Sequence, residues 1–303
     1  MSSDVPRFGP DALRFLRALK RNNRREWFQP RKDEYELVVR APMAALVDRL
    51  ARDMAPDFCK DDYPLRAAGC EVWDGHIFLQ LGETRSPLAE QLGDLPSRFA
   101  NWRMGDLRRA RRIVYDVKAN WKLIVLNFNE CLHCPTLHPA LNRLHHYLGA
   151  DNVAPTATYC GGSMGFKDGV ETMSTDGRRR RDYLPGLDGS QRQFVSYFAI
   201  YPNLLLSLHP DYMMTHTLWP RAHNRTEIVC EWHFHPSELA RPAAQLDDAV
   251  EFWDITNRED WWIAEQSQAG ISSRAYRPGP YSEREELLWS FDDIVRREAA
   301  RVI

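Results

Sequence analysis

The chain has 303 residues, 44% of them hydrophobic, and a formal net charge of −2 at pH 7. This near-neutral charge argues against a dedicated nucleic-acid binder, and no run of about 18 apolar residues predicts a membrane span. The sequence opens without a recognisable signal peptide, and its six cysteines are scattered, unlike a secreted disulfide framework. We therefore expect a soluble cytoplasmic protein in a reducing compartment, with no membrane or nucleic-acid partner and room for one or two domains.

The first 56 residues predict an α-helical hairpin. Apolar residues recur at helical spacing over residues 11–21 and again over residues 32–54, with residues 24–28 between them. We interpret this segment as an amphipathic pair of helices that packs against the rest of the chain.

Short apolar runs dominate the middle of the chain. Residues 67–81 predict a β-hairpin around a Gly-containing turn, residues 87–99 a loop with a short helix, and residues 102–112 a basic, solvated connector. Beyond these, candidate strands separated by proline or charged turns cover residues 113–120, 194–200, 203–208, 213–218 and 226–235.

Two other polar groups in this region are interpreted as structural. In the last candidate strand His233 and His235 fall on the face opposite Trp232 and Phe234, so they are expected to point outward and not to bind a metal. The four consecutive arginines at 178–181 predict a solvated loop, as runs of like charge usually do.

The densest group of chemically active residues lies in residues 127–139, NFNECLHCPTLHP. Glu130 and His133 are three residues apart and would be neighbours on a helix, whereas His138 would point about 140° away from His133 on an unbroken helix. Pro135 stands between the two histidines and is expected to end or kink the helix. That break would let both imidazoles converge on iron, zinc or copper.

A long amphipathic helix over residues 245–270 offers a third ligand. Asp260 falls in its apolar stripe, while Asp254 and Glu259 lie off the stripe and are interpreted as ordinary surface acids. A carboxylate on a buried face is costly unless a cation offsets its charge. A metal held by the two histidines would supply that cation.

Three kinds of site are compatible with these residues. Two histidines and one carboxylate leave open positions on a metal, which is typical of non-haem Fe(II) oxygenases. Zinc could use the same ligands with a water molecule for hydrolysis. Cys131, Cys134 and His138 offer a different zinc site, with one Cys-x-x-Cys pair and one nearby histidine but no second pair.

Longer stretches resemble a known family. NWKLIVLNFNECLHCPTLHP, residues 120–139, closely resembles the catalytic domain of Rieske-type aromatic ring-hydroxylating oxygenase α subunits, and DYPLRAAGCEVWDGHIFLQLGE, residues 62–83, resembles the segment that enters that domain. NLLLSLHPDYMMTHTLWP and SSRAYRPGPYSEREELLWSFD are similar to the branch that contains choline- and betaine-type monooxygenases. The resemblance covers roughly residues 57–303, whereas residues 8–56 resemble the start of an uncharacterised bacterial domain family.

The resemblance implies a fold and an organisation. The expected fold class is α+β, a helix-grip (START/Bet v 1-like) catalytic domain with a curved antiparallel sheet and long helices. It would occupy residues 57–303 and follow a helical segment over residues 1–56. A homotrimer or larger ring is also implied, because electrons in this family cross between subunits.

The same resemblance assigns roles to individual residues. It implies one mononuclear Fe(II) with O₂ as co-substrate, held by His133, His138 and Asp260. Glu130 matches the family's carboxylate between this iron and the Rieske cluster of a neighbouring subunit. For the substrate pocket, we select aromatic and polar candidates by residue type, namely Asn127, Trp219 and Trp253, with Trp232 and Phe198 as further aromatic candidates.

The sequence departs from the family at the [2Fe–2S] cluster. The family binds it with Cys-x-His and a later Cys-x-x-His, but upstream of Asp62 the only cysteine is Cys59, and the first histidine is His76. We therefore predict an oxygenase that hydroxylates or oxidatively N-demethylates a small organic substrate with electrons from an external ferredoxin, reductase or Rieske partner. The alternative is a non-catalytic ligand-binding or assembly subunit that keeps the fold and the metal site.

Overall fold

The computed structural model describes residues 8–22, 24–52, 59, 62, 68–81, 86–242 and 244–300. The chain divides into two compact units, Met1–Ala68 and Gly69–Ile303. The domain boundary that we predicted after residue 56 lies outside the described residues and stays a prediction. Within the described part of the chain, no helix combines the length and apolar character needed to cross a membrane.

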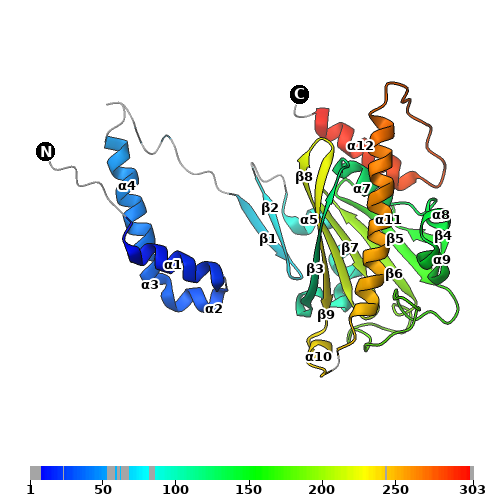
Figure 1. The fold of residues 1–303 in the computed structure, drawn as a ribbon, viewed down its shortest axis with the longest axis horizontal. Helices are drawn as coiled ribbons and strands as arrows, with labels where there is room; N and C mark the ends of the chain where they lie inside the picture. The colour runs from blue at the N-terminus through cyan, green and yellow to red at the C-terminus, as the bar shows by residue number, and fades with distance from the viewer. Residues whose placement is uncertain are drawn as a thin grey trace. The chain divides into compact units, whose positions relative to one another are not determined.

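The first unit is helical, as predicted (Figure 1). Phe15 lies at its centre, with ring centroids 5.7 Å from Trp27 and 5.9 Å from Tyr35. The second predicted helix runs continuously in the helical region to residue 52, but its middle forms a π-helical turn. The segments are α1 (Pro10–Arg21), α2 (Arg25–Phe28), η1 (Gln29–Arg31), α3 (Lys32–Tyr35), η2 (Glu36–Arg40) and α4 (Ala41–Arg52).

The second unit contains a seven-stranded antiparallel sheet in the order β3-β9-β8-β7-β6-β5-β4. The five predicted strands correspond to β3 and to β6 to β9, whereas β4 and β5 were not predicted. A separate hairpin, β1 (Gly69–Trp73) with β2 (His76–Gln80), confirms the turn expected there. The sheet strands are β3 (Arg108–Val117), β4 (His145–Asn152), β5 (Tyr159–Phe166), β6 (Phe194–Ile200), β7 (Leu204–Leu208), β8 (Met213–Ala222) and β9 (Arg225–Phe234).

The sheet is buried on both faces because its strands alternate between two hydrophobic clusters. In β6, Val195 and Ala199 face one cluster, while Phe198 and Ile200 face the other. The second cluster includes Leu92 and residues of the short segments α5 (Leu88–Leu92), α6 (Leu95–Arg98), η4 (Ala100–Trp102) and η5 (Met104–Asp106). The first cluster is covered by the long helices that carry or support the metal-ligand candidates.

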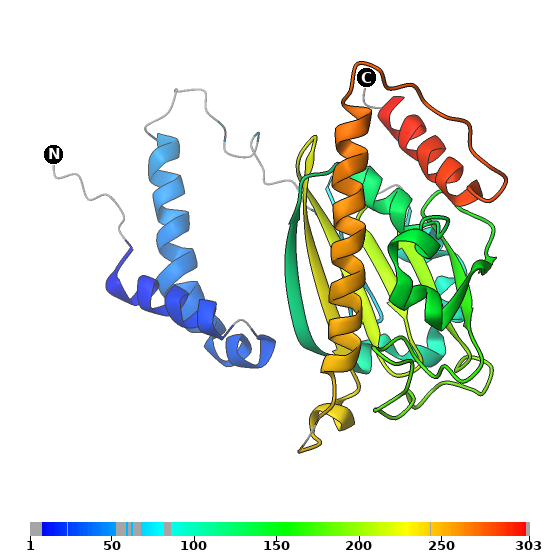
Figure 2. The same ribbon diagram turned by 45° about the vertical axis from the view of Figure 1, so that its right-hand side comes forward.

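The longest of these helices, α11 (Asp247–Ile271), runs across one face of the sheet (Figures 1 and 2). Phe252, Trp253 and Trp261 are buried against the sheet, together with residues of α7 (Trp121–Phe128) and α12 (Glu286–Ala300). The predicted α+β helix-grip class is confirmed. Asp260 lies near the middle of α11, on the side that faces the loop after α7.

The basic connector predicted over residues 102–112 is wrong. Trp102 is only 2% exposed, and its Nε1 donates a hydrogen bond to the carbonyl of His209 at 3.1 Å. The strand β3 begins at Arg108, five residues earlier than predicted, and pairs with β9. The strand β3 lies at the edge of the sheet, and its arginines are exposed. The run of exposed, charged residues therefore indicated a connector where the chain forms an edge strand.

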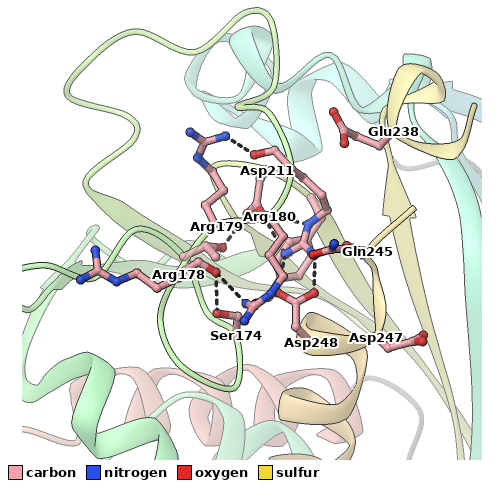
Figure 3. A network of polar contacts seen from close by, with 12 residues as sticks. Ser174, Arg178, Arg179, Arg180, Asp211, Glu238, Gln245, Asp247 and Asp248 are labelled. Atoms are coloured by element: carbon pink, nitrogen blue, oxygen red, sulfur yellow. Dashed lines mark hydrogen bonds and ion pairs between the residues drawn. The ribbon is translucent and has the colours of Figure 1, made fainter. Parts of the chain in front are cut away.

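The arginine run at 178–181 is not simply a solvated loop. Arg181 is 1% exposed, and its guanidinium contacts Asp211 at 2.9 Å, both carboxylate oxygens of Asp248, and the carbonyl of Gln245 at 2.6 Å. Arg180 lies at the edge of the same network, 3.3 Å from Asp248 (Figure 3). Because Asp248 is in the first turn of α11, these contacts attach the loop to that helix.

Candidate metal centre

The two histidines flank a one-turn helix. α7 ends at Phe128, and His133 and His138 stand immediately before and after α8 (Cys134–Leu137), which is followed by α9 (Pro139–Leu144). Glu130 and His133 therefore do not share a helix, contrary to the prediction. Pro135 occupies the first turn of α8, where its missing N–H is tolerated, so it helps to start a helix there and does not kink one.

The predicted convergence of ligand atoms does occur. The Nε2 atoms of His133 and His138 lie 3.2 Å apart. Asp260 Oδ1 lies 2.9 Å from His138 Nε2 and 3.4 Å from His133 Nε2. The loop after α7 and the middle of α11 thus bring three candidate ligand atoms together, although Asp260 lies more than 120 residues beyond the two histidines.

Each imidazole is oriented by a second carboxylate. His133 donates its Nδ1–H to Glu130, which also accepts the backbone N–H of Leu132. His138 donates its Nδ1–H to Glu259 at 2.7 Å. In this tautomer both Nε2 lone pairs point at the common point, which is the usual arrangement around metal-binding histidines.

Glu259 is therefore more than the surface acid that the helical stripe predicted. Its position next to Asp260 was the available signal, but hydrophobic periodicity assigned the two neighbours to different faces. Asn127, predicted as a pocket residue, lines the cavity and donates its side-chain N–H to Asp260 Oδ1 at 2.6 Å. Asp254, the other predicted surface acid, accepts a hydrogen bond from the hydroxyl of Tyr115 at 2.7 Å.

The electrostatics of the group favour a cation. Burial is the largest influence on the pKa of His133 and lowers it, but Asp260 and Glu130 together raise that pKa to about 9. Burial also lowers the pKa of His138, but Asp260 and Glu259 outweigh this effect, so the pKa of His138 is raised. Burial raises the pKa of Asp260, but the two imidazoles bring it down to about 2. An ionised carboxylate next to two facing nitrogens needs positive charge, as a proton or as a metal ion.

The ligand set fits a metal in distance and in chemistry. Ligands about 2.0–2.2 Å from one ion are separated by about 3.0–3.4 Å when the angles between them lie between octahedral and tetrahedral values. The observed separations of 3.2 and 3.4 Å lie in this range, and the third, 2.9 Å, is 0.1 Å below it. Two imidazoles and one carboxylate on one side of an ion leave the other side open, which suits non-haem Fe(II).

The alternative site with two cysteine ligands is not formed. Cys131 and Cys134 are joined in a disulfide, so neither offers a thiolate. His133, Cys134 and His138 do form a cluster whose possible ligand atoms lie within 4.8 Å of one another, but Cys134 Sγ is 4.0 Å from His133 Nε2. Asp260 Oδ1, 3.4 Å from the same nitrogen, is closer and is the better candidate for the third ligand in this state. A reducing environment, expected from the scattered cysteines, would keep both thiols free, so the disulfide differs from that expectation.

The metal-ligand candidates line a cavity of about 220 Å³. Trp253 lines it as predicted, but Trp219 does not: it is 45% exposed on β8. Trp232 and Phe198 are buried in the sheet and are absent from the lining. Sequence reasoning did not find the other lining residues, which include Tyr147, Met164, Tyr197, Arg284 and Leu287.

The fold and the site together define an α+β protein in which two histidines and one carboxylate form a candidate metal centre. The family model for the ring-hydroxylating α subunit (catalytic domain) matches residues 104–300. The chain therefore belongs to this family. A conserved hypothetical family of unknown function matches residues 11–64, which agrees with the second resemblance of the sequence.

Two curated relatives are similar to this chain over most of its length. The chain is 27% identical over 265 residues to the oxygenase subunit of glycine betaine monooxygenase from Pseudomonas aeruginosa, a match that covers 78% of this chain and 61% of that protein. The corresponding subunit from Chromohalobacter salexigens is 26% identical over 268 residues, with 78% and 59% covered. The chain thus spans about three fifths of the length of these relatives.

A solved structure shows the same fold. A quaternary ammonium Rieske monooxygenase, crystallised with an inhibitor, superposes with a TM-score of 0.63 and 19% identity, covering 81% of this chain and 65% of that one. At this identity the likeness concerns the fold.

Proposed function

We propose that residues 69–303 form the catalytic domain of a mononuclear non-haem Fe(II) oxygenase with His133, His138 and Asp260 as iron ligands. The observation that carries the proposal is the set of three ligand atoms within 3.4 Å of one another in the wall of a cavity. Bound iron would supply the reductive activation of O₂. The chain's own carboxylates, Glu130 and Glu259, keep both imidazoles turned toward the ion.

We propose a small quaternary ammonium compound as substrate. The relatives act, by their names, on glycine betaine, and the cavity of this chain suits such a cation. Tyr197 and Trp253 both line it, with ring centroids 6.1 Å apart and planes inclined by 74°. Aromatic faces in this kind of arrangement attract quaternary ammonium groups.

A carboxylate on the substrate would also find a partner. Arg284, in the segment between α11 and α12, lines the cavity, and among the described residues no hydrogen bond or ion pair engages its guanidinium. A substrate that carries both charges would place its carboxylate at Arg284 and its ammonium group at the aromatic rings.

The proposed reaction is oxidative N-demethylation. One O₂, two electrons and two protons convert an N-methyl group to N-hydroxymethyl and water, and the product then loses formaldehyde. These 303 residues carry no Rieske ligand set, so the electrons come from an iron–sulfur partner outside them. Glu130, with a side chain 16% exposed, is proposed to lie on the electron path from a neighbouring subunit of a trimer or larger ring.

The first test is the metal content of the purified chain, with acid-labile sulfide and the ultraviolet–visible spectrum. We expect about one iron per chain, no sulfide and no cluster absorption. His133→Ala and Asp260→Ala should lose the iron, and the exposed neighbour His146→Ala should keep it. Sulfide with additional iron would contradict the proposed external electron source, and zinc that resists replacement by iron would favour a hydrolase.

The second test is turnover. The iron-loaded chain should release formaldehyde from glycine betaine when O₂ and a chemically reduced iron–sulfur protein are supplied. The Asp260→Ala variant should release none. Binding of betaine without formaldehyde under these conditions would overturn the catalytic proposal and favour the ligand-binding subunit.

A further inference from the structure

A disulfide closes the loop that carries both histidine ligands. Cys131 and Cys134 flank His133 closely in sequence, and their bond spans the turn that leads into α8. The other four cysteines are free: Cys59 and Cys70 are exposed, and Cys160 and Cys230 are buried. Neither the proposed iron site nor its oxygenase chemistry uses the disulfide.

The sulfur of Cys134 lies within reach of the metal site. It is 4.0 Å from His133 Nε2, and the Cys134 side chain is only 2% exposed. Zinc bonds of about 2.3 Å to sulfur and 2.0 Å to nitrogen separate the two ligand atoms by about 3.5 Å in a tetrahedral site. A movement of about half an ångström would therefore bring this sulfur into ligand range.

The loop thus offers two overlapping sets of ligands that share both imidazoles. With the disulfide closed, the third ligand is Asp260. With the disulfide open, the Cys134 thiolate can join His133 and His138, which are its partners in the cluster of possible metal ligands. Thiolate ligands shift a site's preference toward zinc, and an additional ligand fills a position that an oxygenase iron must keep open.

We propose that the Cys131–Cys134 disulfide is a redox switch that controls which metal this site retains. In the oxidised state the site has two histidines and one aspartate and accepts Fe(II). In the reduced state the thiolate of Cys134 completes a site for Zn(II) and blocks the oxygenase. The inference rests on the metal site of the proposed function but not on its turnover.

The difference in exposure between the two cysteines determines which sulfur a reductant attacks. Both cysteines line the cavity, but Cys131 is half-buried whereas Cys134 is buried next to the imidazoles. A dithiol reductant would attack Cys131 and form a mixed disulfide, and Cys134 would leave as a thiolate beside the metal site. The second thiol of the reductant then releases Cys131, so the reductant becomes a disulfide and supplies two electrons and two protons in total.

The test compares two single variants of the full chain. Cys131→Ser leaves Cys134 permanently free, and Cys134→Ser removes the proposed ligand while it opens the same disulfide. Metal-free proteins are titrated anaerobically with Zn(II) against a chromophoric chelator, and with Co(II) as a spectroscopic probe. A thiolate ligand gives cobalt a sulfur-to-metal charge-transfer band in the near ultraviolet.

We expect Cys131→Ser to bind Zn(II) more tightly than oxidised wild type does, by about tenfold or more. Wild type that has been reduced with dithiothreitol, and from which the dithiothreitol has then been removed, should behave in the same way. Both should show the cobalt–thiolate band. Cys134→Ser should show neither change, and Fe(II) affinity should vary less than Zn(II) affinity across the series. Equal Zn(II) affinity in the two variants, with no thiolate band in Cys131→Ser, would overturn the proposal.

Counting thiols tests the switch itself. Denatured in a maleimide reagent, the oxidised chain should label at four cysteines and the reduced chain at all six. Six reactive thiols in protein purified without reductant and treated with a mild oxidant would also refute the proposal. Circular dichroism verifies that each variant is folded. Failure to bind any metal would instead refute the proposed function, so the two failures are distinguishable.

Discussion

Glu259 Oε2 lies 2.7 Å from Nδ1 of His138, on the side of the ring opposite the metal site. The next residue of α11, Asp260, contacts Nε2 of the same ring at 2.9 Å. Two consecutive carboxylates of one helix therefore contact both nitrogens of one imidazole. The first fixes its tautomer and orientation, and the second lies beside its Nε2 atom at the candidate metal site.

Replacing Glu259 with glutamine should weaken metal binding without unfolding the protein. The amide cannot act as the anionic acceptor for the Nδ1–H, so His138 becomes less basic and less well oriented. Losing such a partner typically costs about 10–100-fold in metal affinity. The measurement is an anaerobic competition titration with Fe(II) and Zn(II). Glu251→Gln, on an exposed part of the same helix, is the matched control; equal affinities in the two variants would assign Glu259 no role.

Arg284→Ala should reduce discrimination for substrates that carry a carboxylate. A charge-assisted hydrogen bond to such a group contributes about 1.5–3 kcal/mol, so the KM for glycine betaine should rise by about 10- to 100-fold. The KM for choline, which has a hydroxyl in place of the carboxylate, should change little. Arg277→Ala is the control because this exposed arginine belongs to the same segment but does not line the cavity. A parallel rise for both substrates would show that Arg284 shapes the cavity only.

The sequence predicted the sheet and the convergence of the three candidate ligands more successfully than the residues that support those ligands. Strand alternation is a local property, and the face of β9 that carries Trp232 and Phe234 is buried, as expected. The opposite face is covered as well, because Val229 is buried and His233 is partly buried, so the expectation that His233 points outward is wrong. The candidate ligands His133 and His138 lie in one short motif, which the resemblance could identify. Glu259 was missed because helical periodicity assigned it to the polar face of the helix and Asp260 to the apolar face. In the structure both carboxylates contact the same imidazole.

Arg181 was missed for a different reason. A run of four arginines indicates solvation unless specific carboxylates are known to neutralise it. Its two partners, Asp211 and Asp248, are 30 and 67 residues away in sequence, and only the folded chain brings them together. Long-range pairing of this kind leaves no local pattern.

Arg181→Ala should strongly destabilise the second unit. The substitution leaves the fully buried carboxylate of Asp211 and the nearly buried Asp248 without their cation. Breaking a buried pair in this way costs about 3–5 kcal/mol in the free energy of unfolding. Urea denaturation should show this loss, while Arg180→Ala, which removes a partly exposed arginine from the same network, should show a much smaller one. Similar losses in both variants would mean that burial of Arg181 does not determine its contribution.

His216 should make the protein less stable as the pH falls below neutrality. Burial lowers the pKa of its imidazole from 6.5 to about 4, although a hydrogen bond with Asn257 at 3.1 Å opposes the shift. Between these two values the unfolded chain binds a proton that the folded protein does not, so the free energy of unfolding decreases as the pH falls. The two pKa values predict a loss of about 2 kcal/mol between pH 7 and pH 5 from this residue. Urea denaturation at both pH values should therefore show a smaller decrease for His216→Gln than for wild type, and an equal decrease would show that His216 is protonated in the folded protein.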